Sequence, residues 1–168
     1  MTGTLEKTDR KASHTTDEVG QLSQFLPYQL SVASNAVSAL IAERYRNRFG
    51  LKIPEWRIMA VLGDLHTRET SAGMTQRALT DATVMDKVAV SRACKVLENR
   101  GLIERAPNAA DGRSHMMVLT QEGRKIHQEV LPLALATEGE ILDGFSESEQ
   151  KRFRVMLEKL RHKVEDLS

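Results

Sequence analysis

The segment 74–119 constrains the fold of this 168-residue chain more than any other part of the sequence. Thr75 is suited to cap a short helix, whose inward residues we expect to be Ala78, Leu79 and Ala82. After a short connection, Asp86 can cap a second helix, whose apolar residues recur at i, i+3 and i+7: Val90, Ala93 and Leu97. The pattern predicts two helices joined by a tight turn.

The opposite face of the second helix mixes small residues with cations. Its members are Lys87, Ala89, Ser91, Arg92 and Lys95. Small side chains let a helix approach a surface closely, and Lys and Arg meet phosphates or guanine edges. We therefore expect this helix, from Asp86 onward, to enter the major groove of DNA. Thr75 and Gln76, at the start of the preceding helix, are expected to hold phosphate.

A hairpin is predicted directly after the second helix. Gly101 can adopt the left-handed conformation that ends helices. Two strand-like runs follow, 102–105 and 114–119, and the connection between them contains Pro, Asn and an Asp-Gly pair, which favour turns. A hairpin placed in this way after a DNA-reading helix is a wing.

Three short motifs resemble the multiple antibiotic resistance regulator (MarR) family of bacterial winged helix-turn-helix repressors. They are GLIER at 101–105, DGRS at 111–114 and LTQEG at 119–123. The resemblance covers nearly the whole chain from about Phe25, because the flanking helices match in order and length. It implies a fold that is mainly α with a small β-hairpin wing, made of a winged helix-turn-helix domain and a helical dimerisation region.

The resemblance also implies roles for residues of the wing. In the family, an Asp-x-Arg motif places an arginine at or in the minor groove and the aspartate braces it, which assigns these roles to Arg113 and Asp111. Ser114 follows in the same motif and is included among the expected DNA-binding residues. The sequence departs from the family at Val84, where the helix-turn-helix connection often carries glycine.

Helical segments flank the proposed DNA reader. We expect a disordered leader over 1–20, a dimerisation helix over 21–50, the DNA-binding domain over 51–120 and further dimerisation helices over 121–168. The first helix would span roughly 40 Å, more than a small domain needs internally. The last helix carries an apolar stripe: Phe153, Met156, Leu157, Leu160, Val164 and Leu167. A homodimer that presents two recognition helices to a near-palindromic operator in double-stranded DNA is therefore expected.

Charge is distributed unevenly although the net charge is only +1. Residues 75–125 carry a net charge of +3, whereas residues 126–168 carry −3. Positive charge therefore gathers on the proposed reader, as expected when only that part of a protein faces phosphates.

The sequence excludes several other classes of function. No apolar run approaches the ~18 residues of a membrane span, and residues 1–20 lack the apolar core of a signal peptide. We therefore expect a cytoplasmic protein without a membrane partner. The five histidines are scattered, and no phosphate-binding loop, nucleophile motif or acid pair appears. The sequence predicts no metal, no cofactor and no enzymatic activity.

Two alternative functions remain open besides that of a ligand-responsive DNA-binding regulator. Cys94 lies next to Lys95 and near Arg92, and such cations would lower the pKa of the thiol and make it an oxidation sensor. Packing inside the helix is the other interpretation of Cys94, and we favour it. In the second alternative, the wing and the basic helix bind an acidic protein instead of DNA, which salt dependence and sequence preference would distinguish.

Small polar residues share one face of the first helix: Ser31, Ser34, Asn35 and Ser38. They either allow close helix packing or line a ligand pocket, and both interpretations stand. In the family, pockets lie between this helix, the second helix and the reader, which implies further contacts from Tyr28, Trp56, Arg57 and His66. Members with similar segments respond to aromatic carboxylates or their coenzyme A thioesters and control aromatic catabolism. The resemblance therefore implies a small aromatic effector.

Overall fold

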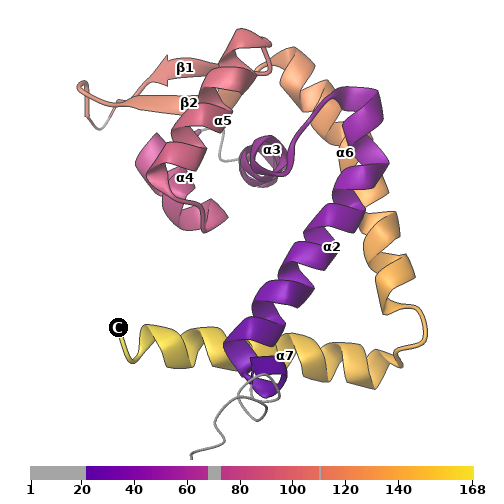
Figure 1. Ribbon diagram of the computed structural model, residues 1–168. Coiled ribbons are helices and arrows are strands. Elements are labelled where there is room, and N and C mark those ends of the chain that lie inside the picture. The colour runs from indigo at the N-terminus through magenta and orange to yellow at the C-terminus, as the bar shows by residue number, and fades with distance from the viewer. Residues whose placement is uncertain (1–21, 68–72, 110) are drawn as a thin grey trace, which may run out of the picture. The chain divides into compact units, whose positions relative to one another are not determined.

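The computed structural model describes residues 22–67, 73–109 and 111–168 (Figure 1). The predicted leader, 1–20, lies outside the described residues. The elements are α2 (Leu26–Phe49), α3 (Ile53–Thr67), α4 (Gln76–Thr83), α5 (Lys87–Asn99), β1 (Ile103–Pro107), β2 (His115–Leu119), α6 (Gln121–Leu142) and α7 (Glu147–Glu165). The predicted fold class, mainly α with a small β-hairpin, is confirmed. The chain divides into two compact units between Val37 and Ser38.

The first unit comprises, among the described residues, a helical turn at 22–24 and the first half of α2. The helix begins at Leu26 and not at residue 21, and Pro27 occupies its first turn, where a missing N–H costs no hydrogen bond. Its large apolar side chains are exposed: Leu22, Phe25, Leu26, Tyr28, Val32 and Val37. This unit therefore contains no apolar core of its own among the described residues.

The core of the second unit is organised around α3. Figure 1 shows α3 end-on, and α3 packs against α4, α5, α6 and β2. Its buried apolar residues lie on one side of the helix, within about 160° of its circumference: Trp56, Ile58, Met59 and Leu62. The predicted DNA-binding domain, 51–120, includes this helix, and both short helices of that domain pack against α3.

An aromatic cluster joins the second half of α2 to α3 and α6. The Trp56 ring lies 5.7 Å from the Tyr45 ring and stacks on the His127 ring at 5.6 Å, measured between centroids. Burial raises the pKa of Tyr45 to about 12. At Gly63 any side chain would collide with the His127 imidazole, so glycine permits α3 and α6 to approach closely here.

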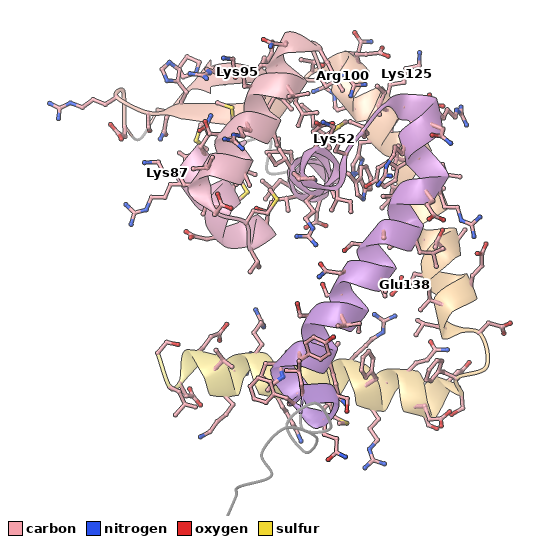
Figure 2. All side chains as sticks on the ribbon, in the orientation of Figure 1. Lys52, Lys87, Lys95, Arg100, Lys125 and Glu138 are labelled. Carbon is pink, nitrogen blue, oxygen red and sulfur yellow. The ribbon has the colours of Figure 1, made fainter. Side chains whose placement is uncertain are left out.

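Arg100 joins the end of α2 to the end of α5 (Figure 2). Its guanidinium donates to the carbonyls of Phe49 at 2.6 Å and Gly50 at 3.0 Å. These groups lie at the C-terminal end of α2, where carbonyls lack helical partners. The buried Glu55 carboxylate lies 3.9 Å from the same guanidinium and accepts a hydrogen bond from the Lys52 backbone N–H at 2.9 Å. The α2–α3 corner is thereby fixed to the C-terminus of α5.

The C-terminal helices begin at capping residues. The Thr120 hydroxyl accepts a hydrogen bond from the Gly123 N–H at the start of α6, and Ser146 and Glu149 form a capping box at the start of α7. No residue of α7 is buried, although its stripe is apolar. Across the described part of the chain, no helix is both long enough and apolar enough to cross a membrane.

Candidate nucleic-acid interface

Helix α4 is held by its cap and by two inward residues. The Thr75 hydroxyl accepts a hydrogen bond from the Ala78 N–H at 3.1 Å, as predicted. Leu79 is fully buried, and Thr83, one turn later, is buried with its hydroxyl bonded to the Leu79 carbonyl. The expectation that Ala82 faces inward is wrong, because packing against α3 and α5 selects the face that Leu79 and Thr83 share at i and i+4.

The turn between α4 and α5 contains a strained residue. Val84 has φ 53° and ψ 40°, and among the described residues it is the one non-glycine with positive φ. A β-branched side chain disfavours this left-handed conformation. Its side chain is 89% exposed, so no packing contact explains the valine. The family's frequent glycine is absent, yet the chain adopts here the conformation that glycine favours.

Helix α5 presents the predicted polar face to solvent. The Asp86 carboxylate accepts from the N–H groups of Val88 and Ala89, both at 2.8 Å, and so caps the helix. The inward residues are Val90, Ala93, Cys94 and Leu97. The predicted DNA-binding side chains Lys87, Ser91, Arg92 and Lys95 are exposed, and Ala89 is half-buried. Figure 2 shows Lys87 and Lys95 near opposite ends of this helix.

Cys94 is buried and poorly suited to sense oxidants. Burial and the nearby Glu98 carboxylate raise the pKa of the Cys94 thiol from 9.0 to about 11, against a smaller lowering by Arg105. The expected lowering of this pKa by Arg92 and Lys95 is wrong, because both cations lie on the exposed side of α5 while Cys94 faces the core. The structure thus agrees with the packing interpretation of this cysteine.

The wing is a regular antiparallel hairpin. Its register pairs Ile103 with Leu119 and Pro107 with His115. At the tip, the Asp111 carboxylate accepts from the backbone N–H of Arg113 at 3.0 Å, and the Asn108 amide donates to the Ser114 hydroxyl at 2.7 Å. Asp111 therefore braces the backbone that carries Arg113, whose side chain is exposed at the tip.

An ion pair joins the recognition helix to the wing. The Arg105 guanidinium on β1 donates to both carboxylate oxygens of Glu98 on α5, at 2.6 and 3.1 Å. These hydrogen bonds lower the pKa of Glu98. Sequence reasoning missed this pair, because a separation of seven residues across a helix end does not identify partners. The contact fixes the wing against the helix that carries Arg92.

A shallow groove brings together Gln76, a predicted phosphate contact, and Lys87, a predicted major-groove contact. It has a volume of about 330 Å³ and lies between α4 and the start of α5, lined by Gln76, Arg77, Thr80, Asp81 and Lys87. Arg77 is exposed and was not among the sequence-predicted residues. The sequence could have identified Arg77 as a further cation of the interface, because it follows Gln76 directly in the first turn of α4.

The expected effector residues fall in both units. In the first unit, Tyr28, Ser31, Ser34 and Asn35 are exposed. In the second, the Arg57 guanidinium donates to the Ser38 hydroxyl at 3.2 Å, which brings two of the predicted residues together. Trp56 is only 9% exposed because it packs between Tyr45 and His127. The His66 side chain lies outside the described part of the chain.

Comparison with known proteins assigns these features to one family. The MarR family profile matches residues 49–114. The transcriptional regulator HosA of Escherichia coli is 31% identical over 107 residues, which are 64% of this chain and 75% of HosA. A MarR/EmrR family regulator from Acinetobacter sp. ADP1 superposes with a TM-score of 0.75 at 28% identity, covering 86% of this chain and 98% of its own.

A further structure shares the fold. CouR from Rhodococcus jostii RHA1, solved bound to p-coumaroyl-CoA, gives a TM-score of 0.69 at 22% identity and covers 83% of this chain and 93% of its own. These relatives are transcription regulators and not enzymes. The matched residues 49–114 include α4, α5 and the tip of the wing, where the exposed cations lie.

Proposed function

The chain belongs to the MarR family of transcriptional regulators, and we propose that it is a homodimeric repressor of an operon for aromatic catabolism. In this proposal it binds a near-palindromic operator in duplex DNA and releases it when a small aromatic acid or its coenzyme A thioester binds. The observation that carries the DNA-binding part is the outward face of α5, where Lys87, Ser91, Arg92 and Lys95 are exposed above a packed apolar face.

The exposed groups divide between base reading and phosphate binding. Arg92, with Ser91 and Lys87, contacts base edges in the major groove, because these residues lie outward in the N-terminal half of the recognition helix. Arg113 at the wing tip reaches the minor groove. Thr75 and Gln76 hold phosphate through N–H groups at the start of α4. In a two-fold dimer the half-sites lie about 34 Å apart, one turn of DNA.

Selection of bound duplexes from a random library tests the DNA-binding proposal. We expect one near-palindromic sequence to be enriched, with an affinity that falls steeply as salt rises. Arg92→Ala should lower affinity for the selected operator more than for random duplex, whereas Gln76→Ala should weaken both alike. Binding without any sequence preference would contradict the proposal, and equal losses for Arg92→Ala would make Arg92 a phosphate contact. Retention by an acidic protein in place of duplex DNA would favour the protein-binding alternative.

The effector proposal rests on a separate observation and has a separate test. Arg57 is half-buried beside the Ser38 hydroxyl, a pair suited to hold a carboxylate or phosphate. CouR, which has the same fold, binds an aromatic acyl-CoA. A thermal-shift screen of phenolic acids and their thioesters should find a ligand that releases the operator in gel shifts. If Arg57→Ala and Asn35→Leu both leave that release unchanged, the effector binds elsewhere and the Ser31–Ser38 face serves packing.

A further inference from the structure

Val88 is an apolar residue that the fold leaves on the outward face of α5. Its side chain is 56% exposed, whereas Val90, two positions later, is 1% exposed. Two residues correspond to about 200° of rotation around an α-helix, so these two valines project in nearly opposite directions. The core therefore makes no use of Val88, in contrast to Val90.

The outward stripe of α5 consists of Val88, Arg92 and Lys95. These residues recur at i, i+4 and i+7 and thus share one helix face, and all three are exposed. Val88 lies in the first turn, two residues after the N-cap Asp86. The N-terminal residues of a recognition helix are the ones that contact base edges. In a docked complex Val88 therefore faces bases, with Arg92 one turn behind it.

The chemistry of the groove limits what a valine can recognise there. A branched hydrocarbon offers no hydrogen bond to a phosphate or to the polar edges of guanine, cytosine or adenine. The 5-methyl group of thymine is the apolar feature that the major groove displays. We propose that Val88 is a specificity-determining residue that reads the 5-methyl group of one thymine in each half-site of the operator. This inference rests on the proposed operator binding.

Replacement of Val88 by alanine should leave the fold intact, which makes the inference testable with a single side chain. The side chain is exposed, and alanine has a higher helix propensity than valine. Val96 offers a matched control, because it is a valine of the same helix with 40% exposure near the C-terminal end. Both alanine variants remove the same atoms from α5.

The experiment combines these variants with duplexes that lack single methyl groups. The operator is first selected with wild-type protein, and each thymine is then replaced in turn by deoxyuridine, symmetrically in both half-sites. We expect one symmetric position at which uracil weakens wild-type binding by roughly fourfold per half-site, the effect of burying one methyl-sized group. Val88→Ala should weaken binding to the thymine duplex by a similar factor and lose this sensitivity to uracil, whereas Val96→Ala should keep it.

The possible results separate the inference from the function on which it rests. If wild-type protein selects no sequence, the proposed operator binding fails. If wild-type protein selects an operator but Val88→Ala and wild type respond equally to uracil at every position, operator binding stands and the thymine contact is overturned. Equal loss of uracil sensitivity in Val88→Ala and Val96→Ala would also overturn it, because the effect would then not belong to the first turn of α5.

Discussion

At the scale of single residues, Val84 shows a conflict between backbone and side chain. Its φ of 53° places a β-branched residue in the left-handed region, and its exposed side chain gains nothing from packing. We expect Val84→Gly to raise the free energy of unfolding by about 0.5–1 kcal/mol, because relief of the strain exceeds the added entropy of the unfolded glycine. Urea unfolding at fixed protein concentration measures the change.

The control for this prediction is Val88→Gly, which places the same substitution in helical backbone. That variant should lose a few tenths of a kcal/mol, roughly 0.3–0.5, because glycine has a lower helix propensity than valine and relieves no strain there. If both variants are destabilised equally, the turn does not hold Val84 in the left-handed conformation.

Cys94 yields a prediction about chemical reactivity. Burial raises the pKa of its thiol to about 11, so the thiolate is scarce at neutral pH. We expect peroxide at pH 7 to leave both Cys94 and operator affinity unchanged, and a thiol reagent to react at the rate of global unfolding. Because the folded pKa lies above the unfolded value, stability is intact below about pH 8.5 and declines as pH rises toward 11. Peroxide-dependent release of DNA that Cys94→Ser abolishes would restore the oxidation-sensor alternative.

At the scale of elements, the Glu98–Arg105 pair couples the recognition helix to the wing. We expect Glu98→Gln to lower operator affinity while leaving affinity for random duplex equal or higher, because the wing loses its alignment but the protein loses a negative charge. Its cost in stability should be below about 1 kcal/mol, since the pair is partly exposed. A double-mutant cycle with Arg105→Gln measures the coupling, and additive effects on operator affinity would contradict it.

The pH dependence of this pair has a defined sign. The hydrogen bonds from Arg105 lower the pKa of Glu98, so its contribution is complete above the ordinary carboxylate pKa of about 4.3. The contribution is lost as pH falls further. Operator binding at neutral pH should therefore be insensitive to this titration.

The elements that sequence predicted well depend on local interactions. The caps at Thr75 and Asp86 involve hydrogen bonds within three residues, so a short motif identifies them. The inward face of α4 was harder to predict. Ala82 is exposed and Thr83 is buried, and this choice depends on how α4 packs against other helices. The outward position of Val88 is overlooked if every apolar residue is assumed to face the core. Because Val90 faces the core, a residue two positions earlier must face outward.

The candidate effector site was the least predictable part for a related physical reason. A stripe of polar residues on one helix does not specify what lies opposite, because that depends on packing between distant segments. The structure brings Arg57 to Ser38 but packs Trp56 between Tyr45 and His127. The sequence pattern identified candidate polar and aromatic residues. It could not show that the Trp56 ring is already covered by packing in the core.

At the scale of the whole molecule, the exposed apolar surface requires an explanation. Helix α7 has no buried residue, yet its stripe includes Phe153, Met156, Leu157 and Val164, all more than 40% exposed. The first half of α2, considered by itself, also exposes apolar side chains. Monomeric proteins rarely leave contiguous apolar surface in water. We propose that a second copy of the chain covers this surface, because a two-fold dimer would present two recognition helices to the proposed palindromic operator.

Leu157 and Val155 provide a matched test of this dimer. Both side chains are 41% exposed on the same helix, but Leu157 belongs to the apolar stripe and Val155 lies about 200° around the helix from it. We expect Leu157→Glu to produce monomers at micromolar concentration in sedimentation velocity, because dimerisation would bury the new carboxylate without a partner. Val155→Glu should remain dimeric and bind the operator normally.

The Leu157→Glu monomer should bind a single half-site weakly and lose the advantage of the palindrome, since two recognition helices no longer act together. If both variants stay dimeric with unchanged operator affinity, the stripe of α7 is not the dimer interface.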